Sequence, residues 1–184
     1  DMVYPVAAKI CSSDIGHKTE IGGVQLSITS LRELTAAIAS IITSVERNAP
    51  DAKLDGILIE SMINNAILEL MVNLRRDSQF GFVLTVASGG VMTEIYKDAS
   101  TVLVPTDDIS LMAALESLHI APLFNGFRGG PAASRTAVLD QIKCLVSLME
   151  STPDIIEIEI NPMMVSTDYA CCADALISIS GTAA

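Results

Sequence analysis

Residues 155–163 read Ile-Ile-Glu-Ile-Glu-Ile-Asn-Pro-Met, and their alternation is the clearest strand pattern in the chain. Polar residues alternate with isoleucine as far as Asn161, and a period of two is typical of a β-strand with one buried face. Pro162 is expected to turn the chain, so that the strand at residues 169–173 returns beside the first one. The stretch therefore predicts an antiparallel hairpin in which Asp174 lies opposite the end of the strand at Asn161.

The polar face of this predicted strand is a candidate metal site. Glu157, Glu159 and Asn161 share it, and Asp174 closes the returning strand. Carboxylate and amide oxygens are hard ligands that suit a Mg²⁺ ion bound to substrate phosphates. An exposed strand face is the alternative reading. However, Asp174 lies in the apolar run at residues 171–179, where an unpaired carboxylate is costly, and this favours a functional role.

A second polar cluster follows the short apolar strand predicted at residues 4–10. Lys9 lies near the end of that strand, and the loop at residues 11–23 contains His17, Lys18 and the pair Gly22-Gly23. Backbone N–H groups and ammonium groups in such a loop can bind phosphate oxygens. His17 can also attack a phosphoryl group, since imidazole is a nucleophile. The alternative is a polar hairpin loop with a solvated histidine.

The rest of the chain mixes strands and helices without a regular βαβ rhythm. A helix at residues 31–47 is expected to begin after Ser30, with Glu33 as its capping-box partner. Further strands are predicted at residues 24–28, 56–60, 67–74, 82–87, 91–96 and 100–104, and further helices at 105–118 and 134–149, with a polar turn at 64–65, a charged turn at 75–79 and a glycine-rich loop at 125–131. This order indicates an α+β protein with a largely antiparallel sheet.

Glutamates on two consecutive predicted strands suggest a pocket for a nucleoside. Glu60 ends one buried strand and is followed by Met62, and Glu69 lies on the next strand. Such groups can contact ribose hydroxyls and the edge of a base. Arg128 in the glycine-rich loop can clamp an anion, or the segment is only a loop. Glycine motifs of the P-loop and dinucleotide-binding types are absent.

Composition excludes several classes of function. The 184 residues carry a net charge of −11, which repels nucleic acids and anionic membranes. No basic-then-apolar leader is seen, and no apolar run reaches the roughly 18 residues of a membrane span. The four cysteines form no C-x-x-C pair, so free thiols in a reducing cytoplasm are expected.

Taken in order, these segments resemble the ATP-grasp subunit of NDP-forming (ADP-forming) acyl-CoA synthetases, the acetate–CoA ligase type within the succinyl-CoA synthetase superfamily. The matching strings lie at residues 5–9, 14–24, 59–62, 76–81, 89–94, 126–129 and 157–163, and Asp174 follows them. The strings HKTEIGGV and EIEINPM are the most specific. The resemblance implies an ATP-grasp fold without its opening segment, residues 1–56 being roughly the N-terminal lobe portion and 57–184 the C-terminal lobe.

The resemblance also implies which residues bind the nucleotide. Lys9 holds a phosphate of ATP or ADP, and Lys18 and Thr19 lie in the phosphate loop. The positions that contact adenosine are Glu60, Met62 and Glu69.

The chemistry implied by the resemblance is acid + CoA + ATP ⇌ acyl-CoA + ADP + phosphate. Asn161 and Asp174 match Mg²⁺ ligands, with Glu159 beside them. His17 matches a histidine that accepts phosphate from a first phosphohistidine and passes it to ADP. Partners are then the CoA-binding and first-histidine domains, in the same enzyme or in a second subunit, and an oligomeric parent enzyme is expected.

The sequence departs from the family pattern at three positions. Asn73 stands where the family has a glycine, residues 86–88 lack another glycine, and Ser134 or a neighbour replaces an acidic residue. Two other readings stay open. One is a non-catalytic ligand-sensing domain of a lysine acetyltransferase, although such a sensor has no need of His17. The other is a structural partner that completes a hetero-oligomer.

Overall fold

The structure is a computed structural model that describes residues 2–90 and 97–181. The chain divides into two compact units whose boundary lies between Asn64 and Asn65. The predicted strand at residues 91–96 falls outside the described residues. Both units combine antiparallel sheets with helices, which confirms the predicted α+β class.

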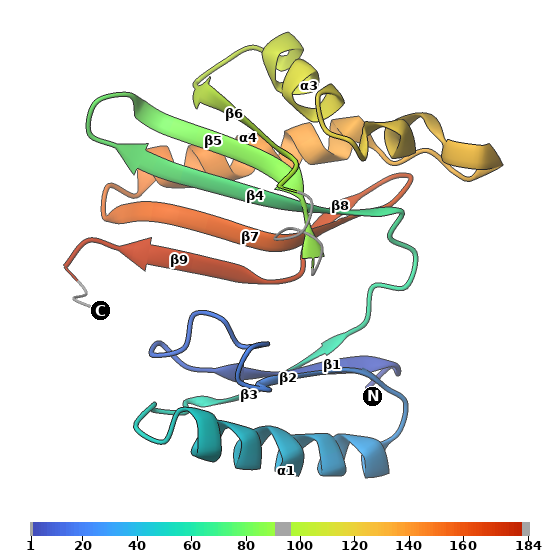
Figure 1. Cartoon of the computed structure of the whole chain (residues 1–184), viewed down its shortest axis with the longest axis vertical. Coiled ribbons are helices and arrows are strands. Elements are labelled where there is room, and N and C mark those ends of the chain that lie inside the picture. Colours follow the sequence, from blue (N-terminus) through green and yellow to red (C-terminus); the bar gives the residue numbers. More distant parts are fainter. Residues whose placement is uncertain (1, 91–96, 182–184) are drawn as a thin grey trace. The chain divides into compact units, whose positions relative to one another are not determined.

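The first unit is a three-stranded antiparallel sheet covered by one helix (Figure 1). The elements are β1 (Val6–Cys11), β2 (Val24–Ile28), β3 (Gly56–Ser61) and α1 (Leu31–Asn48), and β1 lies between β2 and β3. The core joins Val6, Ala8 and Ile10 of β1 to Leu34, Ile41 and Val45 of α1. The opposite face of β1 therefore carries Ala7, Lys9 and Cys11.

Ser30 caps helix α1 as predicted, but the expected capping box is only half formed. The Ser30 hydroxyl accepts a hydrogen bond from the Glu33 N–H at 3.3 Å. The Glu33 carboxylate does not return to Ser30 and instead accepts from the Thr29 N–H and hydroxyl, each at 2.8 Å. The Thr29 backbone bond, followed by the side-chain bond, lowers the pKa of the Glu33 carboxyl. The Glu33 carboxylate therefore fixes Thr29, the residue before the cap, by two hydrogen bonds.

Two expectations about the strands of this unit are wrong. Strand β3 was predicted as buried, yet it is an edge strand, and Leu58 is 46% exposed. In β2, the alternation predicted a single buried face through Leu26 and Ile28. A bulge at Ser27, where φ is +58°, shifts the register, so that Ile28 is buried and Leu26 is exposed.

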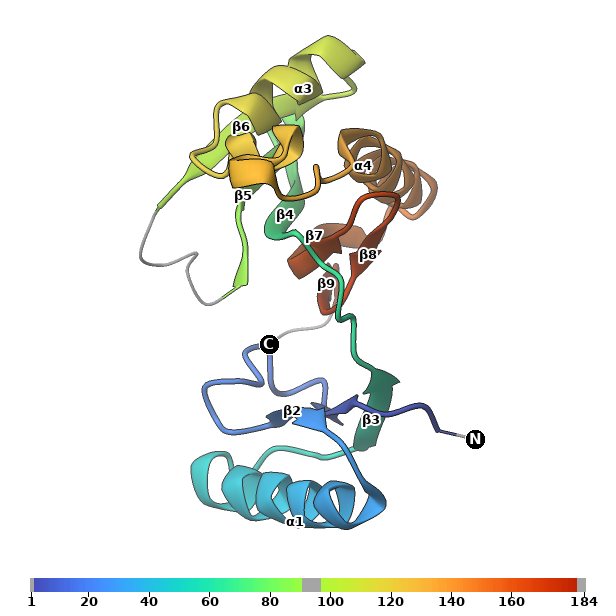
Figure 2. The same cartoon turned by 90° about the vertical axis from the view of Figure 1, so that its right-hand side faces the viewer.

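The second unit is a six-stranded antiparallel sheet with two long helices on one face (Figures 1 and 2). Its strands are β4 (Leu68–Asp77), β5 (Gly81–Ser88), β6 (Ala99–Val104), β7 (Ile155–Val165), β8 (Ala170–Cys172) and β9 (Ala175–Ile179). The helices are α3 (Asp108–Glu116) and α4 (Arg135–Ser151), with the short turns η2 (Ala121–Asn125) and η3 (Phe127–Gly129) between them. The sheet order is β6-β5-β4-β7-β8, and β9 also pairs with β7.

The core of this unit lies between the sheet and its helices. Alternate residues of β4, such as Leu70, Val72 and Leu74, pack in one cluster with Leu115 of α3 and Ile142 of α4. The remaining residues of the strands face the other side of the sheet, here called the open face. None of the helices in the described part of the chain combines the length and apolar character needed to cross a membrane.

Connections between the strands differ from the sequence prediction at three places. Strands β3 and β4 belong to different sheets, so Asn64-Asn65 links two units and is not a turn within one sheet. The lobe boundary expected between residues 56 and 57 lies after the first residue of β3 and stays a prediction. The charged turn begins only after Asp77, because residues 75–77 extend β4. The Asp77 carboxylate accepts the N–H groups of the two residues that close this turn, at 2.9 and 3.0 Å.

The third difference concerns the stretch from which the fold was predicted. Strand β7 does not turn at Pro162 but continues through a cis peptide bond to Val165. The chain reverses at residues 166–169, where the Ser166 N–H donates to the Tyr169 carbonyl at 2.9 Å. The buried Ser166 hydroxyl accepts from the N–H groups of Asp168 and Tyr169. A serine turn, and not the proline, therefore makes the hairpin.

Candidate functional site

The open face of the large sheet carries a group of polar side chains from β4 and β7. Residues that pair across the two strands face the same side, and the register pairs Asn73 with Glu159 and Arg75 with Glu157. Ile158 and Ile160 between them are buried against the helices. The predicted alternation along β7 is therefore confirmed, and both glutamates lie half-buried on the open face.

Asn161 and Asp174 lie next to each other, as the sequence predicted. The Asn161 N–H donates to the Asp174 carbonyl at 3.2 Å, and the Ala173 N–H donates to the Pro162 carbonyl at 3.0 Å. Asp174 occupies the short link between β8 and β9, and its carboxylate accepts the Ala175 N–H at 3.1 Å. Backbone pairing thus holds Asn161 of β7 next to Asp174 of the β8–β9 link, and both residues carry oxygen-bearing side chains.

A backbone N–H that the sequence analysis did not single out also reaches this place. The Gly90 N–H donates to the Asn161 side-chain oxygen at 2.9 Å. Gly90 has a φ of +69°, a conformation that favours glycine. Gly90, which lies in one of the strings that match the family pattern, therefore contacts a proposed metal ligand.

Glu69 lies against the same glycine. The Gly89 N–H donates to the Glu69 carbonyl at 2.9 Å, and a Cβ atom added at Gly90 would lie 2.0 Å from Glu69 Oε2. Glu69 and Glu60 were predicted on consecutive strands of one pocket. The structure places them on strands of different units, and within the second unit it brings Glu69 to the Gly90–Asn161 contact.

The departure from the family pattern at residue 73 has a visible consequence. The Asn73 side-chain amide donates to Glu157 Oε1 at 2.8 Å across the two strands. A glycine at this position has no side chain with which to make that bond. One carboxylate of the polar face is therefore held by a side chain that a glycine would not supply, and Glu159 is the residue that pairs with Asn73.

Lys9 of the first unit forms an ion pair with Glu60. Lys9 Nζ lies 2.8 Å from Glu60 Oε2, and the two side chains are 13% and 42% exposed. Because Ala7 pairs with Glu60 and Lys9 pairs with Leu58, both charges lie on the face of the sheet opposite α1. Two residues with separate predicted roles, phosphate and adenosine binding, therefore share one contact.

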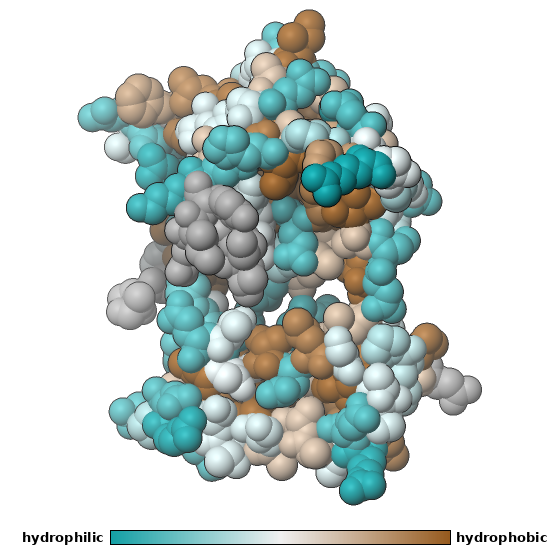
Figure 3. All heavy atoms as spheres, turned by 45° about the vertical axis from the view of Figure 1, so that its right-hand side comes forward, coloured by the Kyte–Doolittle hydropathy of each residue, from teal (hydrophilic) through white to brown (hydrophobic). Residues whose placement is uncertain are grey.

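The face around this ion pair is partly apolar. Leu26 and Leu58 are 57% and 46% exposed. Met62 follows β3, and its N–H donates to the Pro5 carbonyl at 3.0 Å. Apolar and hydrophilic side chains lie side by side on the visible surface of both units (Figure 3). The ion pair of Lys9 with Glu60 therefore lies beside exposed apolar side chains.

The loop that contains His17, Lys18 and Thr19 is held at its two ends. The buried Ile15 anchors its first half in the core, and the Gly23 N–H donates to the Lys18 carbonyl at 2.7 Å. Lys18 is half-buried, whereas His17 and Thr19 are exposed.

Both glycines of the loop are required by close contacts. A Cβ atom at Gly22, where φ is +73°, would lie 2.5 Å from Ser44 Oγ of α1. A Cβ atom at Gly23 would lie 2.7 Å from the Ile10 side chain and 2.9 Å from the Lys18 carbonyl oxygen. The glycine pair therefore sets the path of the loop, while the side chains of residues 17 and 19 reach the solvent.

Sequence reasoning missed a buried carboxylate in the second unit. Asp98 is 7% exposed and accepts a hydrogen bond from the Ser88 hydroxyl at 2.6 Å. The His119 N–H donates to its two oxygens at 3.0 and 2.9 Å. Burial acts to raise the pKa of Asp98, but the bonds from Ser88 and His119 outweigh it and the pKa is lowered. Nothing in the local pattern distinguishes Asp98 from a loop aspartate.

Arg128 keeps only a local contact among those described. It is exposed, has a φ of +51°, and lies with its guanidinium 5.2 Å from the centre of the Phe127 ring. Arg135, at the start of α4, instead holds the glycine-rich loop by donating to the Phe124 carbonyl and the Asn125 side chain at 2.7 and 2.9 Å. The anion-clamp role of Arg128 stays a prediction.

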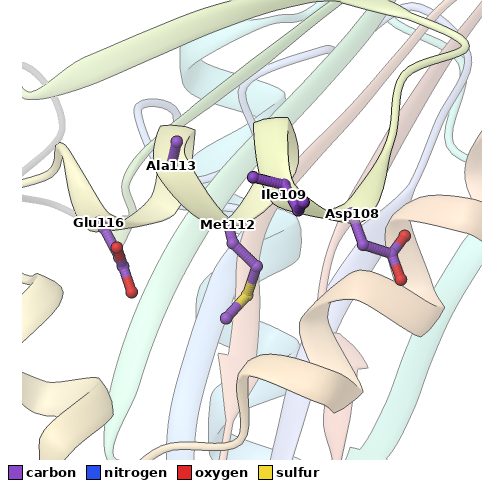
Figure 4. Close-up of a pocket in the computed structure, with 5 residues that line it drawn as sticks. All are labelled: Asp108, Ile109, Met112, Ala113 and Glu116. Atoms are coloured by element: carbon purple, nitrogen blue, oxygen red, sulfur yellow. The ribbon is translucent and has the colours of Figure 1, made fainter.

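A shallow hollow on the surface of α3 lies away from these polar groups. It is lined by Asp108, Ile109, Met112, Ala113 and Glu116 (Figure 4). Because α3 covers the face of the sheet opposite the open face, the hollow contains none of the predicted site residues. It gives no separate support for a binding site.

The oxygen donors of the open face fit a magnesium ion. In the described residues, no group of three or more His, Cys, Asp or Glu side chains forms a metal cage. Mg²⁺ does not need one, since it usually takes one or two protein carboxylates together with waters and substrate phosphates. Asn161 and Asp174, paired through their backbones, supply such a partial set of hard ligands.

Comparison with known proteins shows the family of the chain. A family model described as ATP-grasp domain matches residues 1–179. The beta subunit of acetate–CoA ligase [ADP-forming] I from Pyrococcus furiosus is 33% identical over 172 residues, which cover 94% of this chain and 74% of that subunit. Acetate–CoA ligase [ADP-forming] I from Archaeoglobus fulgidus is 31% identical over 162 residues, 88% of this chain. The chain spans only 23% of the length of that longer ligase.

A solved structure agrees with these relatives. It is that of dinucleotide-forming acetyl-coenzyme A synthetase 1 from Ca. Korarchaeum cryptofilum, in complex with coenzyme A and Ca-AMPCP. The TM-score is 0.88 at 29% identity, and the match covers 96% of this chain and 77% of the other. The chain therefore belongs to the ATP-grasp domain family, in the form that is found in ADP-forming acetate–CoA ligases.

Proposed function

We propose that the chain binds ATP or ADP with Mg²⁺ and carries out the nucleotide step of an ADP-forming acyl-CoA synthetase. The observation that carries the proposal is the pairing of Asn161 with Asp174 on the open face of an ATP-grasp domain. In this proposal the two side chains, with Glu159 beside them, hold the Mg²⁺ ion of the nucleotide. Magnesium supplies positive charge that neutralises the phosphates.

The groups of the first unit have matching roles. Lys9 donates to a nucleotide phosphate, and Lys18 and Thr19 add donors from the loop. The residues proposed to contact adenosine are Glu60, Met62 and Glu69. The ion pair of Lys9 with Glu60 supports this role, because Glu60 holds the ammonium group in place before a phosphate arrives. Ordering a charged group in advance reduces the cost of binding.

His17 is the proposed phosphoryl acceptor. A neutral imidazole nitrogen attacks the γ-phosphorus of ATP, the new N–P bond forms as the bond to the ADP oxygen breaks, and ADP leaves. In the reverse direction phosphohistidine returns its phosphoryl group to ADP. The exposure of His17 supports this role, since a side chain that exchanges phosphate with a second histidine must be reachable by it.

The complete reaction requires groups beyond this chain. We propose that a CoA-binding domain and a domain with the first histidine, in the same enzyme or in a partner subunit, complete the conversion of a carboxylic acid, CoA and ATP into acyl-CoA, ADP and phosphate. Acyl phosphate and phosphohistidine are the expected intermediates. An oligomeric parent enzyme in the cytoplasm is part of the same proposal.

Nucleotide binding tests the site residues first. Calorimetric titration of the chain with Mg·ADP should show affinity reduced about tenfold or more in Lys9→Ala and in Asp174→Ala, since each removes a charged contact of roughly 1.5–3 kcal/mol. Lys53→Ala is the matched control, because Lys53 belongs to the same unit and forms an exposed ion pair with Asp55 at 2.9 Å. Unchanged affinity in both site variants would refute the assignment.

Phosphoryl transfer is tested with the parent enzyme and γ-labelled ATP. We expect a label that is stable in base and labile in acid, and that is lost from this domain in His17→Asn. Label on the partner histidine is separated by proteolytic mapping. Nucleotide binding without any such label in the wild-type enzyme would favour the non-catalytic ligand-sensing alternative.

A further inference from the structure

We infer that Gly90 is a positioning residue whose N–H fixes the side-chain oxygen of Asn161 for metal binding. The inference rests on the proposed function, because it takes Asn161 to be a magnesium ligand. The inference adds to the proposed metal site the backbone N–H of a residue that follows β5, which the sequence pattern did not identify as part of that site. Three observations within the second unit carry it.

The first observation is the direction of the hydrogen bond. A backbone N–H can only donate, so the group that Gly90 meets at 2.9 Å must be the oxygen of the Asn161 carboxamide and not its NH₂. The contact therefore selects one of the two orientations of the amide. Mg²⁺ also requires the oxygen. An amide oxygen has two lone pairs, so it can accept from Gly90 and bind a metal at the same time.

The second observation is that Asn161 is fixed from both sides. Its own N–H donates to the Asp174 carbonyl, which sets the backbone beside the second proposed ligand. The Gly90 bond then sets the end of the side chain. Groups that orient a metal ligand through a hydrogen bond typically change metal affinity by roughly 10–100-fold when they are removed.

The third observation is that no side chain fits at residue 90. A Cβ atom there would lie 2.0 Å from Glu69 Oε2 and 3.2 Å from Glu69 Cδ, and the φ of +69° is strained for any other residue. Gly89, which precedes it, is tied to the Glu69 carbonyl and lies against the backbone of Leu70. The position of the Gly90 N–H is therefore determined by β4, where Glu69 and Leu70 lie.

The test compares Gly90→Ala with Gly81→Ala. Gly81 has a φ of +79° in the turn at the other end of β5, and a Cβ atom there meets nothing within 4 Å. The two substitutions therefore introduce similar backbone strain, but only one disturbs the contact with Asn161. The ADP affinity of the whole chain is measured by calorimetry with and without saturating Mg²⁺, and the ratio of the two is the readout.

We expect Gly90→Ala to lower the Mg²⁺ enhancement of ADP affinity about tenfold, and Gly81→Ala to leave it unchanged. In an Asn161→Ala background, Gly90→Ala should have no further effect on the enhancement, because the two changes remove one interaction. The inference would be overturned if Mg²⁺ enhanced ADP affinity equally in Gly90→Ala and Gly81→Ala while Asn161→Ala abolished the enhancement. That result would leave the proposed function standing. Full enhancement in both Asn161→Ala and Asp174→Ala would remove the metal assignment itself, and the inference with it.

Amide NMR of the wild-type chain keeps the inference testable if Gly90→Ala does not fold. The Gly90 amide should show a coupling through the hydrogen bond to the Asn161 carboxamide carbon. Its nitrogen shift should move on addition of Mg·ADP, and this movement should be absent in Asn161→Ala. A Gly90 amide that exchanges freely with solvent and shows no such coupling would contradict the inference.

Discussion

At the scale of single residues, the charged groups of both sheets are held by partners that are distant in the sequence. Lys9 meets Glu60 across two strands, Asn73 meets Glu157 across two others, and Asp98 meets the backbone of His119. The first two contacts lie on faces with proposed nucleotide and metal roles. Asp98 contacts no proposed ligand, and its bonds join the ends of β5 and α3 to the start of β6.

Asp98 provides a prediction for the pH dependence of stability. Asp98→Asn should lower the free energy of unfolding at neutral pH by about 1–3 kcal/mol, because an amide cannot accept all the bonds that the carboxylate receives. The pKa of Asp98 is lowered in the folded protein, so its contribution is present above the unfolded pKa of about 3.9 and is lost as the pH falls through the folded value. Urea denaturation should therefore show a difference between wild type and variant that is constant above about pH 5 and shrinks below about pH 4.

Asp51→Asn is the control for this prediction, since Asp51 is exposed in the turn after α1. It should change stability by less than about 0.5 kcal/mol at either pH. A difference between wild type and Asp98→Asn that grows on acidification would contradict the assignment of Asp98 as a stabilising carboxylate.

At the scale of elements, local pattern predicted where strands and helices lie more reliably than how they pair. The capped helix α1, the strand β5 and the helix α4 after Ser134 lie close to their predicted ranges. The strands predicted at residues 56–60 and 67–74, with a polar turn between them, belong to different sheets, because β3 pairs with β1 and β4 pairs with β5 and β7. Both β3 and β4 have apolar alternation, and alternation identifies a buried face but not the neighbouring strand.

Two glycines, Gly89 after the end of β5 and Gly56 in β3, allow a test of one close approach between elements. A Cβ atom at Gly89 would lie 2.4 Å from the Leu70 carbonyl carbon, and backbone atoms cannot move aside as a side chain can. Gly89→Ala should therefore destabilise the chain by about 1–3 kcal/mol in urea denaturation. At Gly56, in the edge strand β3, an added Cβ atom meets nothing within 4 Å, so Gly56→Ala should be neutral or stabilising by about 0.4–1 kcal/mol. Equal effects of the two substitutions would show that β4 and Gly89 are not in contact.

At the scale of the whole molecule, two compact units meet at Asn64 and Asn65, and the proposed roles are divided between them. Lys9, His17 and Lys18 belong to the first unit, and Asn161 and Asp174 to the second. The chain has a net charge of −11, so a nucleotide polyphosphate is repelled on average. Binding then depends on the few local cations and on the metal ion.

Removal of magnesium tests whether nucleotide binding to the whole chain depends on the metal ion. Mg·ADP at 100 times its dissociation constant should raise the free energy of unfolding by about 2.7 kcal/mol, because the ligand binds only the folded protein. The measurement is thermal unfolding with ADP, with and without EDTA, and chelation should remove most of the shift. The same chelation without ADP should change the unfolding temperature little. A shift that survives EDTA would show that the nucleotide binds without the metal.

The features that could be predicted from the sequence are local: the alternation of Glu157, Glu159 and Asn161, the cap at Ser30, the cationic loop of an acidic chain, and the strings that mark the family. These features depend on the spacing and chemistry of side chains within a few residues of each other, so a short segment is enough to predict them. Tertiary structure alone decided that Ser166 and not Pro162 reverses the chain, and that Gly90 meets Asn161. Those contacts join segments far apart in sequence, and strand register, which sets them, depends on the packing of the whole sheet.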